Sequence, residues 1–220
     1  RRQRQMCIRD RLMAKRAYSP KEVLQKTYTT LPWGGEWACA FGYPSTNETW
    51  LIHGPSGSGK SSFVMQLAKE LTNYGTVLYV SYEEGVSQSF QQRLQRFHMN
   101  EVQGRFRIVT SDTVDELIAR LRNKKSPKFV IIDSFQKADW SYEDYTRIRD
   151  AFPRKTFIII SQEYKGQPMG KPAGRVKYDA GVKVRCSGYR AYCQGRFIPA
   201  AGAHYVIWKE GILKTSNNLD

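Results

Sequence analysis

The chain has 220 residues, of which 40% are hydrophobic and 13% aromatic, enough for one large domain, or one domain with an appendage, around a substantial core. No stretch approaches the roughly 20 apolar residues that span a bilayer, and the charged N-terminus lacks a secretory signal, so we expect a cytoplasmic protein without a membrane partner. The net charge of +15 favours a polyanionic partner, nucleic acid first. No cysteine has metal-ligand spacing, so free thiols are expected, although Cys186 and Cys193 could pair if their strands meet.

The first twelve residues resemble a translated adapter sequence more than the start of a protein. Residues 5–11 read QMCIRDR, which is the translation of a transposon end used in sequencing-library adapters. We therefore expect residues 1–12 to be a non-native artefact and Met13 to be the true start. These residues hold five arginines and one aspartate, so the net charge without them is +11, which is still strongly basic.

The remaining chain divides into a lead-in and one domain. Residues 13–30 are a short basic lead-in, and residues 31–45, rich in Gly, Pro and Trp, are predicted to be irregular. Apolar periodicity then predicts strands at 49–53, 76–82, 106–110, 129–132 and 156–161, alternating with helices at 60–73, 86–99, about ten residues capped by Asp112, and 142–152. Three strands without helices follow at 181–186, 188–196 and 203–208. This order predicts an α/β domain over residues 31–220, with a mostly parallel sheet flanked by helices and antiparallel strands at the C-terminal end.

The loop after the first predicted strand carries a phosphate-binding pattern, G-x-x-x-x-G-K-[ST]. Its residues, with the serine that follows, are Gly54, Pro55, Ser56, Gly57, Ser58, Gly59, Lys60, Ser61 and Ser62. Glycines let backbone N–H groups curl around a phosphate, and the N-terminus of the next helix points its positive end at the same group. Lys60 is expected to reach the β- and γ-phosphates of ATP, and Ser61 to offer its hydroxyl to Mg²⁺. The alternative is a glycine-rich turn that binds nothing.

Polar residues at the ends of three other strands could complete a hydrolytic site. Asp133 ends the run FVIID and is expected to hold the Mg²⁺ shell, although it could instead cap a helix. Glu83, ahead of Glu84, could activate the attacking water, unless both belong to a solvated turn. Gln162 ends another apolar run and could contact the γ-phosphate, unless it is ordinary loop polarity.

A basic region follows at residues 164–197, with eight Lys or Arg against one acid and interleaved aromatic residues. Its first part, KGQPMGKPAGR, is rich in Gly and Pro and is expected to be a mobile loop. Cations with aromatic residues suit single-stranded nucleic acid, through phosphate pairing and base stacking. The candidate contacts are Lys165, Lys171, Arg175 and Lys177. A solvated basic loop, with the tyrosines serving as strand residues, is the open alternative.

These motifs together resemble the RecA-like P-loop ATPases, in the branch of DnaB-type helicases, RadA-type repair ATPases and KaiC-type proteins. The stretches YVSYEEG, VIIDSFQ, IIISQ, SQEYKGQPMGKPAG and YDAGVKVRC carry the resemblance, which covers about residues 33–213. It implies Glu83 as the catalytic base, ATP bound between subunits of a ring or filament, and a DNA-facing loop after Gln162. The helicases place Lys-x-Arg on a late hairpin that reaches a neighbour's nucleotide, and here the matching stretch is Gln194-Gly195-Arg196. Arg196 is therefore a candidate trans-acting finger without the lysine.

Three functions are compatible with these features. The first is an oligomeric, DNA-stimulated ATPase of recombination, repair or replication. The second is a KaiC-like nucleotide switch with a protein partner, which would not require so basic a loop. The third is phosphoryl transfer to a nucleotide or small molecule, for which the sequence offers no acceptor site. The 220 residues hold neither a helicase primase-binding domain nor the zinc finger or protease-like domain of the repair proteins.

Overall fold

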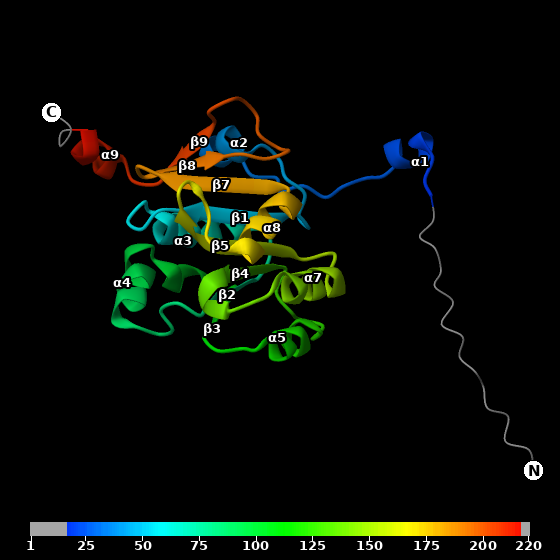
Figure 1. Ribbon diagram of the computed structural model, residues 1–220, viewed down its shortest axis with the longest axis horizontal. Coiled ribbons are helices and arrows are strands. Elements are labelled where there is room, and N and C mark those ends of the chain that lie inside the picture. Colours follow the sequence, from blue (N-terminus) through cyan, green and yellow to red (C-terminus); the bar gives the residue numbers. More distant parts are fainter. Residues whose placement is uncertain (1–16, 217–220) are drawn as a thin grey trace, which may run out of the picture.

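The computed structural model describes residues 17–216, so the predicted artefact at residues 1–12 lies outside the described residues. Parallel and antiparallel strands form one sheet, at the centre of Figure 1. The strands are β1 (Thr49–Gly54), β2 (Val77–Ser81), β3 (Phe106–Val109), β4 (Phe129–Asp133), β5 (Thr156–Tyr164), β6 (Gln167–Pro168), β7 (Val182–Ser187), β8 (Arg190–Cys193) and β9 (His204–Val206).

The strand order within the described residues is β3-β2-β4-β5-β1-β7-β8-β9, with β6 paired to β5. The strands from β3 to β7 in this order are parallel, whereas β8 and β9 are antiparallel to their neighbours. The fold is thus the predicted α/β arrangement with antiparallel strands late in the chain. All parallel strands present their carboxyl ends at one edge, where ligands of open α/β sheets bind.

Helices cover both faces of this sheet. The α-helices are α1 (Pro20–Leu24), α2 (Gly35–Phe41), α3 (Lys60–Leu71), α4 (Gln88–Arg96), α5 (Val114–Leu121), α6 (Phe135–Ala138), α7 (Tyr142–Ala151), α8 (Lys171–Asp179) and α9 (Lys209–Ser216). A 3₁₀ helix, η1 (Met99–Val102), follows α4. Apolar residues of α2, α3 and α4 form one buried cluster with one face of the sheet, and those of α5, α6, α7 and α8 form a second with the opposite face.

The buried strands explain the architecture. Every residue of β1, β2 and β4 is buried, as expected for strands covered on both faces. Residues Phe63, Leu67 and Leu71 of α3 recur at helical spacing and are fully buried. The alternation of buried strands with amphipathic helices therefore fixes the sheet and holds the segment between β1 and α3 at its carboxyl edge.

Local structure differs from expectation in three places. The segment 31–45 contains helix α2 instead of being wholly irregular, because Trp37 stacks on Tyr205 at 4.3 Å between ring centroids and holds the helix against the late strands. Thr113, not Asp112, caps α5 through a capping box. The predicted mobile loop after Gln162 is the β5–β6 hairpin followed by helix α8, whose apolar face joins the second buried cluster.

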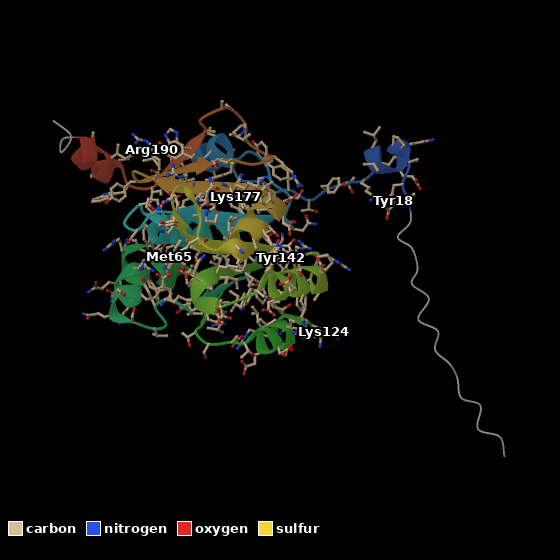
Figure 2. The ribbon with its side chains drawn as sticks, viewed as in Figure 1. Tyr18, Met65, Lys124, Tyr142, Lys177 and Arg190 are labelled. Carbon is tan, nitrogen blue, oxygen red and sulfur yellow. The ribbon has the colours of Figure 1, made fainter. Side chains whose placement is uncertain are left out.

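The N-terminal helix lies apart from the sheet. Helix α1 has no buried residue, and Figures 1 and 2 show it with Tyr18 at a distance from the remaining elements.

Of the cysteines in residues 17–216, Cys39, Cys186 and Cys193 are free thiols. Within the same residues, no helix is long and apolar enough to cross a membrane.

Candidate nucleotide-binding site

The phosphate-loop pattern lies between β1 and α3, at the carboxyl edge of the sheet. Gly57 and Gly59 have φ angles of 73° and 93°, in the left-handed region that favours glycine. Gly54 is required for a different reason, because an added Cβ would lie 2.3 Å from the carbonyl oxygen of Cys186 on β7. The glycines therefore permit both the backbone turn and its close approach to the neighbouring strand.

Lys60 begins α3 and folds back over the loop. Its Nζ donates to the carbonyl oxygens of Gly54 and Pro55, each at 2.7 Å. Burial lowers the pKa of the Lys60 ammonium, whereas nearby acids, among them Glu83 and Asp133, act in the opposite direction. The lysine is thus held over the loop, within the field of the acidic groups that the sequence singled out.

A cavity of about 1050 Å³ opens above this loop and collects most of the predicted site. The predicted residues in its lining are Ser56, Gly57, Gly59, Lys60, Ser61, Ser62, Glu83, Glu84, Asp133 and Gln162. Gly54, Pro55 and Ser58 shape the loop and are not in the lining. Residues that follow β1 and β2 thus meet residues of β4 and β5 at one place, although they are far apart in the sequence.

Asp133 is the buried acid at the end of β4. Its side chain accepts a hydrogen bond from the Tyr79 hydroxyl on the adjacent strand β2. Burial raises the pKa of Asp133 to about 6, the Tyr79 hydrogen bond lowers it, and the neighbouring Glu83 raises it. A bound cation would favour the ionised form, because it supplies the opposite charge that this buried carboxylate lacks. Sequence analysis missed Tyr79, although it is the first residue of the quoted stretch YVSYEEG.

The two adjacent glutamates after β2 have different surroundings. Glu84 is paired with Arg93 of α4, with Oε1 and Nη2 2.7 Å apart. Glu83 is exposed, and its carboxylate has no hydrogen-bond or ion-pair partner within residues 17–216, while its backbone N–H donates to the carbonyl oxygen of Asp133. A carboxylate that is not engaged by a cation is the better proton acceptor. The pairing of Glu84 therefore favours Glu83 as the base.

Gln162 lies where β5 leaves the sheet, level with Gly54 of β1. Its backbone N–H donates to the side chain of Gln136 on α6, and its carbonyl accepts from the backbone N–H of Met169 after the hairpin. Gln136 also donates to the Ser161 hydroxyl and to the Met169 carbonyl oxygen. Gln136, which the sequence analysis did not single out, thus fixes the segment that carries Gln162.

The oxygen donors at this edge fit Mg²⁺ bound together with a nucleotide. Ser61 and Asp133 offer one hydroxyl and one carboxylate to the same cavity, and the Ser134 hydroxyl is buried without a hydrogen-bond partner. Within the described residues no cluster of three or more His, Cys, Asp or Glu could hold a metal ion. Few protein ligands together with substrate phosphates are the usual environment of Mg²⁺.

The opposite flank of the cavity is apolar and aromatic. Tyr189, Ile207 and Trp208 line it, and a Cβ added to Gly59 would lie 3.2 Å from the Tyr189 ring. Tyr189 has a φ angle of 57° in the turn between β7 and β8, an uncommon conformation for an aromatic residue. Gln66 of α3 donates to the Ile207 carbonyl oxygen at 3.1 Å and fixes this flank to the helix that begins at the loop.

The predicted nucleic-acid contacts surround the β5–β6 hairpin and α8. Lys165 is exposed at the hairpin turn beside the Tyr164 ring, and Lys171 is exposed at the start of α8. Lys177 donates to the side chain of Gln167, and Figure 2 labels it on α8. Arg175 lies over the Tyr142 ring at 3.7 Å and pairs with Glu143 of α7. Lys165, Lys171 and Arg175 are thus exposed, whereas Arg175 and Lys177 contact polar side chains of their own chain.

Arg196 is not part of the cavity. It is exposed after β8, and its backbone N–H donates to the carbonyl oxygen of Gly181. Gly181 precedes β7, so Arg196 lies at the edge of the sheet opposite the phosphate loop. This position lies at the far end of β7 from the phosphate loop, so Arg196 does not reach a nucleotide bound in its own chain.

The phosphate loop and strand-end acids on a mostly parallel sheet define a P-loop ATPase domain. The family profile described as AAA domain matches residues 30–147, more than half of the chain, and the chain belongs to this family. The DNA repair protein RadA of Streptococcus pyogenes serotype M6 is 36% identical over 86 residues, which are 39% of this chain and 18% of that protein. RadA of Streptococcus pneumoniae is 34% identical over 86 residues, which are 39% of this chain and 20% of that protein. The match therefore spans about a fifth of the length of these relatives.

A solved structure shares the fold. The flagellar accessory protein FlaH of Methanocaldococcus jannaschii aligns with a TM-score of 0.58 and 13% identity, over 81% of this chain and 93% of FlaH. The chain thus has a RecA-like P-loop ATPase fold and is similar to RadA over 86 residues, in agreement with the resemblance that the sequence motifs indicated. The similarity to RadA does not favour the alternative of a KaiC-like nucleotide switch.

Proposed function

We propose that this domain, from residue 31 onward, binds ATP with Mg²⁺, hydrolyses it, and is stimulated by single-stranded DNA. The observation that carries the proposal is the continuity of two features along β5. Gln162 lines the nucleotide cavity, and the exposed Tyr164 and Lys165 lie two and three residues after it on the hairpin. A nucleotide and a polyanion would therefore bind a few residues apart on one strand.

The residues that line the cavity indicate in which orientation a nucleotide would bind. Glu83, Asp133 and Gln162 lie on the side of β2, β4 and β5, where a γ-phosphate would meet a base and a polar side chain. The ribose and base would then extend toward Tyr189 and Ile207, because that flank offers an aromatic face and no charge.

Hydrolysis in this arrangement would depend on positioning and charge. The loop N–H groups and Lys60 would hold the β- and γ-phosphates, and Glu83 would accept a proton from the attacking water. Ser61 and Asp133 would hold Mg²⁺, which neutralises developing charge on the phosphates when bound. Gln162 would contact the γ-phosphate and would lose this contact when the phosphate is released after hydrolysis.

The DNA part of the proposal uses the hairpin and α8. Lys165 and Lys171 are exposed and can pair with phosphates, and Tyr164, 65% exposed, can stack on a base. The RadA relatives are named as DNA repair proteins, which supports this partner. We also propose a homo-oligomer in which Arg196 of one subunit approaches the nucleotide of the next, because Arg196 is exposed and remote from its own cavity.

The test is the rate of ATP hydrolysis with and without single-stranded DNA, measured with particle mass. We expect stimulation by DNA, and binding that weakens linearly with the logarithm of the salt concentration. The double variant Lys165→Gln and Lys171→Gln should reduce that slope by about 1 to 2, whereas Lys124→Gln and Lys125→Gln, after α5, serve as a charge-matched control. Hydrolysis that does not respond to DNA, together with no salt-dependent binding, would refute the DNA assignment and leave the ATPase assignment intact.

A further inference from the structure

A buried glutamate beside the cavity links three neighbouring strands. Glu163 follows Gln162 on β5 and receives two hydrogen bonds from Arg185 of β7, Nε to Oε2 at 3.0 Å and Nη2 to Oε1 at 2.8 Å. Nδ1 of His53, on β1, lies 2.9 Å from Oε2 of the same carboxylate. The side chains of Glu163 and His53 are only 5% and 1% exposed. Since β1 pairs with both β5 and β7, one carboxylate joins the carboxyl ends of three adjacent strands.

The charge states of Glu163 and His53 follow from their surroundings. The hydrogen bond from Arg185 is the main reason that the pKa of Glu163 is lowered, so its carboxylate is ionised. Burial lowers the pKa of His53, so its ring is neutral and its Nδ1–H donates to Glu163. Nε2 of His53 is buried without a hydrogen-bond partner. A single anion is thus held by one guanidinium and one neutral imidazole.

Glu163 borders two parts of the molecule that the proposed function connects. It lines the nucleotide cavity together with Gln162. It is also the first residue of the β5–β6 hairpin, where it pairs with Pro168. The hairpin turn uses Lys165 and Gly166, both at positive φ. The conformation of the Glu163 backbone therefore sets where the exposed tip of the hairpin begins.

A γ-phosphate at the Gln162 end of the cavity would act on this group through charge. Its negative charges would repel the Glu163 carboxylate and attract the Arg185 guanidinium across a short distance in a poorly solvated region. The bidentate contact restricts how the carboxylate can respond, because rotation alone would break a hydrogen bond to Arg185. The repulsion would therefore move the end of β5, and the β5–β6 hairpin would move with it.

We propose that Glu163 is a positioning residue that transmits the presence of the γ-phosphate to the β5–β6 hairpin, and that Arg185 and His53 hold it in place for this purpose. The proposal rests on the proposed function, because it requires ATP in the cavity. It does not require that the hairpin bind DNA.

Amide hydrogen exchange of residues 163–170 tests the proposal, with Mg²⁺ and either ADP or a non-hydrolysable ATP analogue. The wild-type chain should exchange differently in the two nucleotide states. Glu163→Gln keeps the shape of the side chain and removes its charge, so it should lose the difference in exchange when each nucleotide is present at a concentration that saturates the variant. Arg185→Lys keeps the charge and loses the bidentate contact, so the difference should shrink. Glu101→Gln, which breaks an exposed ion pair with Lys69 outside the cavity, should keep it.

Three results would overturn the proposal. The first is an unchanged difference in exchange in Glu163→Gln. The second is a wild-type chain that binds both nucleotides and shows no difference at residues 163–170. If circular dichroism shows that Glu163→Gln does not fold, Arg185→Lys decides, and a full wild-type difference in that variant counts against the relay. A wild-type chain that fails to bind ATP refutes the proposed function itself, which the binding measurement reveals before any exchange experiment.

Discussion

Replacing Lys60 with alanine is the sharpest test of the nucleotide site. Lys60 begins α3 and donates to the carbonyl oxygens of Gly54 and Pro55, each at 2.7 Å. In the ATP complex the same ammonium group would turn to the phosphates. The substitution removes this charge at the start of an otherwise intact helix, so its effect should fall on nucleotide affinity and not on folding.

The expected loss of ATP affinity follows from comparing Lys60 bound to a phosphate with Lys60 bound to the two carbonyl oxygens of the loop. Attraction between the ammonium and one phosphate charge about 4 Å away contributes about 4 kcal/mol at an effective dielectric constant of about 20. Giving up the two carbonyl contacts offsets about 1–2 kcal/mol of this. The net loss of about 2–3 kcal/mol in Lys60→Ala raises the Kd for ATP about 30- to 150-fold.

Isothermal titration of ATP in the presence of Mg²⁺ measures this change. Lys69→Ala is the matched control, because Lys69 lies on the same helix but is not in the lining of the cavity, and it pairs with Glu101, which is not in the lining either. Circular dichroism and thermal unfolding establish that both variants are folded. A folded Lys60→Ala protein with a Kd within about threefold of wild type would refute the assignment of the phosphate loop.

The remaining predictions concern the base, the aromatic flank and a buried histidine. Glu83→Gln should retain ATP binding and lose turnover by at least about 100-fold, and if Glu84→Gln does so instead, the wrong acid has been named. Tyr189→Ala should raise the Kd for ATP about fivefold through the loss of about 1 kcal/mol of stacking, measured by titration with Tyr43→Ala as the exposed control; equal affinities would exclude stacking. Because burial lowers the pKa of His53 below its usual 6.5, the unfolded chain takes up this proton first, and the contribution of His53 to the free energy of unfolding should fall as the pH drops below 6.5. Urea unfolding of His53→Asn at about pH 7.5 and about pH 5.5 should show a smaller decrease than wild type, and an equal decrease would contradict this origin.

Sequence reasoning was most successful where the physical requirement is local. The phosphate loop needs glycines at particular backbone positions, and Gly57 and Gly59 have the positive φ angles that explain them. Buried strands such as FVIID read as continuous apolar runs, and the acid at the end of that run lines the cavity. The alternation of such strands with amphipathic helices was sufficient to predict the sheet and the edge at which the site lies.

Local composition was misleading where tertiary contacts decide the conformation. Glycines and prolines after Gln162 predicted a mobile loop, yet α8 forms there because Ala173 and Val176 are buried in the second apolar cluster. The segment with Gly34 and Gly35 forms α2 because its aromatic residues pack on the late strands. In both cases burial of an apolar face outweighs weak helix propensity.

The sequence by itself determined the class of fold, the phosphate loop and the acids at the strand ends, because each depends on neighbouring residues or on a short period. Only the tertiary structure decided which polar groups act on one another. Asp133 meets Tyr79 across 54 residues of sequence, and Glu163 meets His53 across 110. Pairs of this kind leave no trace in local composition, since the partners become neighbours only when parallel strands end at the same edge of the sheet.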